Sequence, residues 1–199
     1  MKLKYTLAAL AATTLASNAV ITVVATTSFE TSDNFASGNN QSTAYNITAT
    51  DSSVWTSTVG TFGGTWAGQA LTGAQSSVHG NTSTLTVNAA GSDGVTTVDF
   101  SWERFTASTG NIVVESSTDG GATFANTQNF AIAGAAGGGW AAETATFNQT
   151  GDVIVRFTIA GTGGVSFDDI TVSADVVPEP SSTALLGLGG LALILRRRK

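Results

Sequence analysis

The chain of 199 residues contains no cysteine, a single histidine and two prolines, and only 11% of its residues are charged. The lack of cysteine excludes disulfide scaffolds, thiolate zinc sites and cysteine nucleophiles. One histidine, His79, excludes a metal site built from several imidazoles. A typical soluble domain is about 25% charged. Here the polar surface must come instead from hydroxyl groups, which 32 Thr and 20 Ser supply.

Basic residues are scarce between the two ends of the chain. Arg104 and Arg156 are the two basic residues of the segment 20–177, which holds 13 acidic residues and so carries a net charge of −11. Nucleic-acid binding depends on Lys and Arg side chains that neutralise phosphates. The composition therefore excludes nucleic acid as a partner, and anionic membrane surfaces would repel this segment.

The N-terminus has the three parts of a secretory signal. Lys2 and Lys4 precede an apolar stretch over residues 7–15, and small residues follow it up to Ala19. A basic start, a short apolar stretch and small residues at the cleavage site are typical of a signal peptide. We expect signal peptidase to cleave after Ala19, with Ala25 as the alternative site, so that residues 1–19 are removed and the chain is exported.

The C-terminus also has three parts in a defined order. A Pro-Glu-Pro motif is followed by twelve apolar residues over 184–195 and then by a basic cluster; these residues are Pro178, Glu179, Pro180, Arg196, Arg197, Arg198 and Lys199. As a helix the apolar run would be about 18 Å long, shorter than the roughly 30 Å hydrocarbon core of a bilayer. The basic cluster is expected to stay in the cytoplasm.

This tail, residues 178–199, resembles the PEP-CTERM sorting signal of Gram-negative bacteria. The resemblance implies that the precursor inserts transiently into the membrane through the short C-terminal helix. It further implies cleavage by an exosortase near 178–180, and then a place at the cell surface or outside the cell, often with exopolysaccharide. An ordinary C-terminal membrane anchor is the alternative.

Between the two ends, residues 20–177 are enough for one domain with a buried core. Val98, Phe100 and Trp102 alternate with polar residues, which is typical of a half-buried strand. Further strands are expected over 82–87, 112–115, 143–148, 153–159 and 165–173, separated by Gly- and Asp-rich turns. This spacing predicts an all-β domain, a single β-sandwich, with a barrel as the alternative.

The runs 24–29 and 165–172 resemble the first and last strands of jelly-roll modules in carbohydrate-binding and adhesin-like surface proteins. The resemblance implies a β-sandwich of jelly-roll type with these two strands close together. It also implies a structural Ca²⁺ between them, held by Glu30 and Asp168, with Asp33 or Asp169 assisting. A solvated acidic edge is the alternative.

Strand alternation adds a constraint to this calcium site. It predicts that Phe167 and Asp169 face one side of the last strand and that Asp168 faces the other, so that not every acidic residue can serve as a ligand.

Residues 117–124 resemble the Asp-box of sialidase-like propellers, where the motif shapes a hairpin and is not catalytic. Asp119 is expected to accept backbone N–H bonds across the turn. We interpret this segment as a structural hairpin, because one copy cannot build a propeller.

Catalytic groups are hard to assemble from this chain. No nucleophile motif accompanies His79, which we expect to be exposed or on an edge strand. A hairpin turn at 107–110 would bring Glu103 and Glu115 close enough for glycoside hydrolysis. A register shifted by one residue would instead pair Arg104 with Glu115, and we prefer this ion pair. The chain is therefore expected not to be an enzyme, and a jelly-roll glycoside hydrolase is the third hypothesis.

Four tryptophans remain. Trp102 belongs to the alternating strand and is expected in the core, whereas Trp55, Trp66 and Trp140 are candidate platforms for sugar rings or seals of the sandwich rim. The sequence thus predicts an exported surface or matrix protein, sorted by an exosortase and associated with exopolysaccharide. A carbohydrate-binding module is the second hypothesis.

Overall fold

The computed structural model describes residues 20–35, 44–58, 63–66, 70–88, 94–105, 107–134 and 139–176. For Val20, residues 63–66 and residues 175–176 it describes the backbone alone. The predicted signal peptide and the Pro-Glu-Pro tail lie outside the described residues.

The described chain is built from strands and one short 3₁₀ helix, η1 (Thr31–Asp33). In chain order the strands are β1 (Val20–Thr27), β2 (Tyr45–Thr48), β3 (Val54–Ser57), β4 (Gly63–Trp66), β5 (Ser76–Gly80), β6 (Thr84–Asn88), β7 (Gly94–Arg104), β8 (Thr109–Ser117), β9 (Ala125–Ala131), β10 (Ala141–Thr150), β11 (Ile154–Thr162) and β12 (Gly164–Val176).

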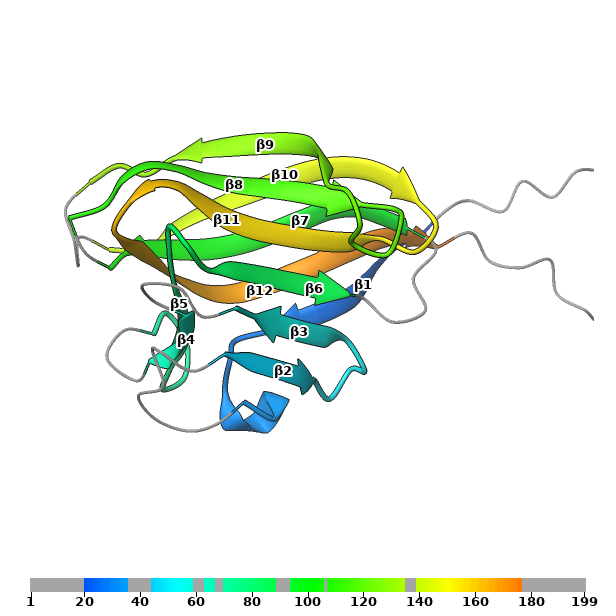
Figure 1. Cartoon of the computed structure of the whole chain (residues 1–199). Coiled ribbons are helices and arrows are strands. Elements are labelled where there is room, and N and C mark those ends of the chain that lie inside the picture. Colours follow the sequence, from blue (N-terminus) through cyan, green and yellow to red (C-terminus); the bar gives the residue numbers. More distant parts are fainter. Residues whose placement is uncertain are drawn as a thin grey trace, which may run out of the picture. The chain divides into compact units, whose positions relative to one another are not determined.

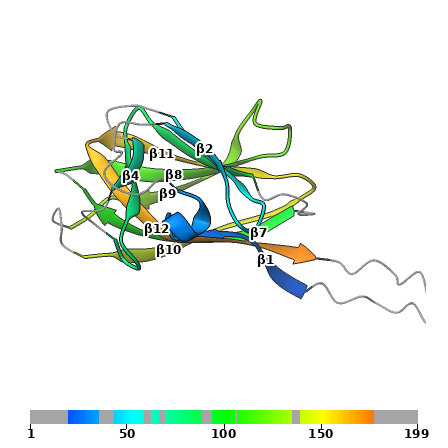
Figure 2. The same ribbon diagram turned by 90° about the horizontal axis from the view of Figure 1, so that it is seen from below.

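Within the described residues these strands form two six-stranded sheets (Figure 1). One sheet has the order β10-β7-β12-β5-β4, with β1 also paired to β12, and the other has the order β2-β3-β6-β11-β8-β9. Consecutive strands β2 and β3, and β4 and β5, pair with each other. After β5 the chain changes sheet at every connection between described strands except the one from β8 to β9. This two-sheet arrangement is the predicted β-sandwich of jelly-roll type. As expected, β1 lies beside β12 (Figure 2).

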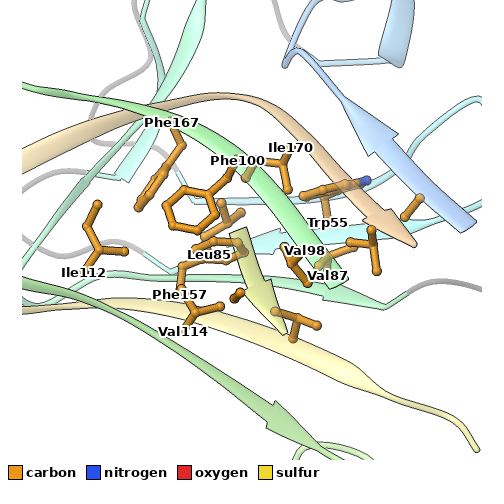
Figure 3. Close-up of a cluster of buried hydrophobic side chains, with 14 of the residues drawn as sticks. Trp55, Leu85, Val87, Val98, Phe100, Ile112, Val114, Phe157, Phe167 and Ile170 are labelled. Carbon is orange, nitrogen blue, oxygen red and sulfur yellow. The ribbon is translucent and has the colours of Figure 1, made fainter. Parts of the chain in front are cut away.

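Aromatic rings from both sheets meet in the middle of the core (Figure 3). Phe157 of β11 lies 5.3 Å from Phe100 of β7 and 5.3 Å from Phe167 of β12, measured between ring centroids. Each such pair contributes about 0.5–1.5 kcal/mol beyond the burial of its surface. The predicted alternation in β7 is confirmed, because Val98, Phe100 and Trp102 are at most 5% exposed.

The connection from β7 to β8 crosses between the sheets and does not form a hairpin. Ser108 fixes this connection, because its Oγ donates to the carbonyl of Gly164 at 2.6 Å and accepts from the Gly164 N–H at 2.7 Å. The strands beside β8 are therefore β11 and β9, and Glu115 pairs with Arg156 of β11 at 2.7 Å. The predictions that placed Glu115 opposite Glu103 or Arg104 are wrong for this reason.

Candidate functional site

A cavity of about 250 Å³ lies where the end of β7, the start of β10 and the end of β9 meet. Strands from both sheets contribute to its wall, since β7 and β10 belong to one sheet and β9 to the other. The lining residues are Trp102, Arg104, Ala131, Ala133, Gly134, Gly139, Ala141 and Glu143. Five of these residues are Ala or Gly, whose small size leaves the space open. Trp102, Arg104 and Glu143 supply an aromatic ring, a guanidinium and a carboxylate.

The side chain of Trp102 lines this cavity, but its N–H group is buried away from the open space. The side chain is 5% exposed, and its Nε1–H has no hydrogen-bond partner among the described residues. Leaving a buried donor unsatisfied costs about 1–3 kcal/mol. Most buried polar groups in proteins are paired. Because this N–H is covered, a molecule in the cavity would contact the indole ring and not the N–H.

The two glycines of the cavity wall are held by adjacent residues at the end of β7. The Arg104 guanidinium donates to the carbonyl of Gly134, and Glu103 accepts the N–H of Gly139 at 3.0 Å. Side chains of successive residues in a strand point to opposite faces. Arg104 and Glu103 thus each hold the backbone of one of the two glycines that line the cavity.

Glu143 places a carboxylate at the same cavity. It lies on β10, which is an edge strand among the described residues, and it is only half-buried. Its carboxylate forms no hydrogen bond or ion pair with the described part of the chain. Glu143 also lines a more open hollow of about 500 Å³ on the outer side of the sheet, together with Asp99, Ser101 and Asp169.

A guanidinium donor and a carboxylate acceptor beside an indole ring can recognise a molecule that both donates and accepts hydrogen bonds. Hydroxyl groups do both. Sequence reasoning placed Trp102 in the core but missed the cavity, because its wall comes from three separated segments. The Gly-rich stretch before Trp140 was the one sequence signal beside it.

A second polar cluster connects the residues after β1 and the strand β12 to the segment that precedes β5. Glu30 Oε1 accepts the N–H groups of Ala74 and Gln75 at 2.7 and 2.8 Å. Asp168 Oδ2 accepts those of Leu71 and Thr72 at 2.7 and 3.2 Å. The two predicted calcium ligands are thus brought to one segment, residues 71–75, as anchors of its backbone.

A bulge in β12 changes the predicted side-chain directions here. Pairing with β7 shifts between Asp168 and Thr171, and Asp169 has φ of 46°. As a result, Thr72 Oγ1 donates to Asp169 Oδ1 at 2.6 Å, on the segment that Asp168 also holds. The prediction that Asp169 shares the face of Phe167 is therefore wrong. Burial raises the pKa of Asp168 to about 6, although three N–H donors oppose the rise.

Carboxylate oxygens suit Ca²⁺, which takes six to eight oxygen ligands. The described residues do not bring three or more His, Asp or Glu side chains together as a metal site. Asp33, proposed to assist, instead accepts bonds from Thr27 Oγ1 and the Ser28 N–H, both at 3.1 Å. The described side chains alone do not form a calcium cage, and the site at Glu30 and Asp168 stays a prediction.

The three tryptophans proposed as sugar platforms differ. Trp55 is 0% exposed and donates from Nε1 to Ser53 Oγ at 2.7 Å, so its role as an exposed platform is wrong. It faces the core because β3 is covered by the opposite sheet. Trp66 lies in β4, but its side chain is outside what the structure describes. Trp140 is half-buried, and its role stays a prediction.

His79 is buried, 1% exposed, and lies on β5 between β12 and β4. Its Nε2 is 2.8 Å from Ser77 Oγ and its Nδ1 is 3.3 Å from Ser83 Oγ. Burial lowers the pKa of the imidazole to about 3. The expectation of an exposed or edge-strand histidine is therefore wrong, because the hydroxyls of two serines allow the ring to be buried neutral.

The hairpin interpretation of residues 117–124 is confirmed. Asp119 Oδ1 accepts the Thr123 N–H at 2.9 Å, and Asp119 Oδ2 accepts from Thr123 Oγ1 at 2.6 Å. Ser117 Oγ donates to Asp119 at 2.7 Å. These bonds, those from Thr123 first, lower the pKa of Asp119 to about 2. The motif closes the turn between β8 and β9.

Residues 176–199 match the model of the PEP-CTERM protein-sorting motif. The match confirms the sorting signal in the tail and marks the chain as an exported protein of the exosortase system. Among curated proteins, no sequence matches this chain. Within the described ranges, no helix is both long and apolar enough to span a membrane.

Several solved structures are similar. One is the CBM22-1 xylan-binding domain from Paenibacillus barcinonensis Xyn10C, at 15% identity and a TM-score of 0.41, over 78% of this chain and 95% of that one. Another is the K3 adhesin domain of Lys-gingipain from Porphyromonas gingivalis, at 15% identity and a TM-score of 0.45, over 78% and 99%. At these identities, the ligand of this chain must be inferred from its own surface.

Proposed function

We propose that this chain is an exported surface protein whose β-sandwich associates with exopolysaccharide by binding it and without catalysis. The observation that carries the proposal is the cavity beside β7, where Glu143 offers a carboxylate that has no partner among the described residues. Sugar hydroxyls can donate to this carboxylate, and the indole ring of Trp102 lines the same cavity.

The position of the sorting motif supports the location. The motif begins at residue 176, where β12 ends. The sandwich is therefore the cargo that the signal delivers, and exosortase and signal peptidase are its partners during export. A net charge of −11 over residues 20–177 favours a ligand that is not strongly acidic.

The carboxylates considered for glycoside hydrolysis support a binding role. A glycosidase needs two carboxyl groups about 5–9.5 Å apart across the scissile bond. Glu103 accepts the Gly139 N–H, and Glu115 is paired with Arg156 on the other sheet. Each of these groups has a structural partner, and they lie on different sheets.

The proposal is tested by co-sedimentation of the purified chain with exopolysaccharide from its own host. We expect the wild type to sediment with the polymer and Glu143→Gln to sediment less. Asp152→Asn is the matched control, because it removes an exposed carboxylate from the turn at the far end of β10. A wild-type chain that stays in the supernatant would contradict the proposal.

A further inference from the structure

We propose that the open hollow on the outer side of the sheet β10-β7-β12 binds an ammonium group, carried by an amino sugar with a free amine in the exopolysaccharide. This inference rests on the proposed function and names the class of sugar that the same surface takes, because Glu143 lines both the hollow and the cavity. Its support comes from an unpaired hydroxyl in the floor of the hollow and from the charges around it.

Ser101 supplies the unpaired hydroxyl. It lines the hollow from β7, on the face opposite to the core-facing Phe100. Ser101 is 9% exposed, and its side chain forms no hydrogen bond with the described residues.

The hydroxyl of Ser101 is within reach of a ligand. In the described chain, the unpaired side-chain atoms that are fully covered are Ser76 Oγ and Trp102 Nε1. Ser101 Oγ is not one of them, so a molecule in the hollow can contact it. Most buried polar groups in proteins are paired, and a donor on a bound molecule would pair this one.

Two carboxylates line the same hollow. Asp99 lies on the outer face of β7, two residues before Ser101, and Asp169 lies at the bulge of β12. Thr144 Oγ1 donates to Asp99 Oδ1 at 2.5 Å, and Thr72 Oγ1 donates to Asp169 Oδ1 at 2.6 Å. The second oxygen of each carboxylate, Oδ2, has no hydrogen-bond partner among the described residues.

The protein does not neutralise these two charges with the basic residues that the structure describes. Arg104 donates to the carbonyl of Gly134, Arg156 is paired with Glu115 on the other sheet, and neither lines the hollow. The segment 20–177 has a net charge of −11. Both the adjacent carboxylates and the field of the whole segment therefore favour a cation in the hollow.

An ammonium group fits this set of acceptors. It has three N–H donors and no acceptor, and Ser101 Oγ, Asp99 Oδ2 and Asp169 Oδ2 are the acceptors that line the space. A uronate would be repelled by both carboxylates. The hollow has a volume of about 500 Å³, within the range of pockets for drug-sized ligands, so a sugar ring can enter it.

The test is calorimetry on the full chain with two hexasaccharides that differ only at their amines, the β-1,4-linked hexamer of glucosamine and its N-acetylated counterpart. We expect the glucosamine hexamer to bind about tenfold more tightly, because only its amines carry charge. Added NaCl should weaken this binding, because salt screens exposed charges. Nα-acetyl-lysine amide, an ammonium without a sugar ring, should bind more weakly than the glucosamine hexamer.

Three variants locate the binding in the hollow. Asp99→Asn and Asp169→Asn should each weaken the binding of the glucosamine hexamer about threefold. Both keep the shape of the side chain, and Asn tolerates the positive φ of residue 169. Ser101→Ala should also weaken the binding, although it changes no charge. Asp152→Asn is the matched control, because it removes an exposed carboxylate from a turn and should leave the binding unchanged.

Equal affinity for the two hexamers would overturn the inference, and this comparison on the wild type needs no variant. Equal weakening by Asp152→Asn and by the variants of the hollow would also overturn it, as would tighter binding of the lysine amide. In each of these cases the proposed function stands if the wild type sediments with exopolysaccharide. A wild type that binds no polysaccharide would remove the proposed function itself. Thermal unfolding checks that each variant is folded.

Discussion

Glu30 and Asp168, which lie far apart in the sequence, hold the same segment of backbone. Each carboxylate accepts two N–H groups of residues 71–75, Glu30 at 2.7 and 2.8 Å and Asp168 at 2.7 and 3.2 Å. Glu30 follows the first strand, and Asp168 lies in the last. The segment that precedes β5 is thereby tied both to the residues that follow β1 and to β12, and these two strands pair with each other.

Glu30→Ala should destabilise the domain, because it removes the acceptor of two backbone N–H groups. Hydrogen bonds to charged acceptors contribute about 1.5–3 kcal/mol, so we expect a loss of about 1–3 kcal/mol in the free energy of unfolding. Urea unfolding measures it. Asp152→Ala, which removes an exposed carboxylate in a turn, is the control. Equal stability of the two variants would show that the anchoring bonds contribute nothing.

The calcium site predicted from the sequence has a direct test. It requires that CaCl₂ raise the Tm of the EDTA-treated wild type and that Asp168→Asn abolish the rise, because the amide lacks the charge that a hard cation prefers. Magnesium chloride at equal ionic strength is the control. An unchanged wild-type Tm would mean that Glu30 and Asp168 serve as backbone anchors alone.

His79 should make the fold sensitive to acid. Its pKa is about 3 in the folded chain and 6.5 in the unfolded chain, so the unfolded state takes up the proton first as the pH falls. The contribution to stability is full above pH 6.5 and is lost progressively between pH 6.5 and 3, by a total on the order of 5 kcal/mol. Unfolding in urea at pH 7 and pH 4 should show a larger loss for the wild type than for His79→Asn.

Over part of this pH range, the titration of Asp168 changes the stability in the opposite direction to that of His79. Its folded pKa is raised to about 6 from a usual 3.8, so the folded state holds the proton more tightly. Its contribution to stability falls as the pH rises from about 4 to 6. The pH dependence of the free energy of unfolding that comes from His79 is therefore best measured in Asp168→Asn, where Asp168 no longer titrates. A slope that does not change when His79 is replaced in that background would contradict a buried neutral imidazole.

Asp119 should stabilise the hairpin between β8 and β9 at neutral pH and lose this effect in strong acid. Its pKa is lowered to about 2 in the folded chain, so its contribution is present above about pH 4 and is lost as the pH falls through 2. We expect Asp119→Ala to lower the Tm at pH 7, with a smaller difference near pH 2. Thr118→Ala, an exposed neighbour, should change the Tm little at either pH.

Strand positions could be predicted from the sequence because alternation survives in half-buried strands. Val98, Phe100 and Trp102 follow the period of two and all face the core. The pairing of β7 and β8 with their neighbours could not be predicted, because these two consecutive strands lie in different sheets. The connection fixed by Ser108 sends β8 to β11, and no local pattern around residues 105–108 encodes that crossing.

The candidate site was harder to predict for two reasons. A bulge breaks the alternation of side chains at Asp169. The face on which this side chain lies is therefore set by how β12 pairs with β7 and cannot be counted from its position in the sequence. The cavity of Trp102 and Glu143 forms between segments that only the fold brings together. Trp55 shows the converse, because its Ser- and Thr-rich surroundings suggested exposure whereas Ser53 allows its N–H to be buried.

The central claim is most directly tested by co-sedimentation of the purified chain with exopolysaccharide from its host, compared between the wild type and Glu143→Gln. The account predicts that the wild type sediments with the polymer and that Glu143→Gln sediments less, because sugar hydroxyls lose their charged acceptor at the cavity. A wild type that stays in the supernatant, or a Glu143→Gln variant that sediments as well as the wild type, would contradict the account.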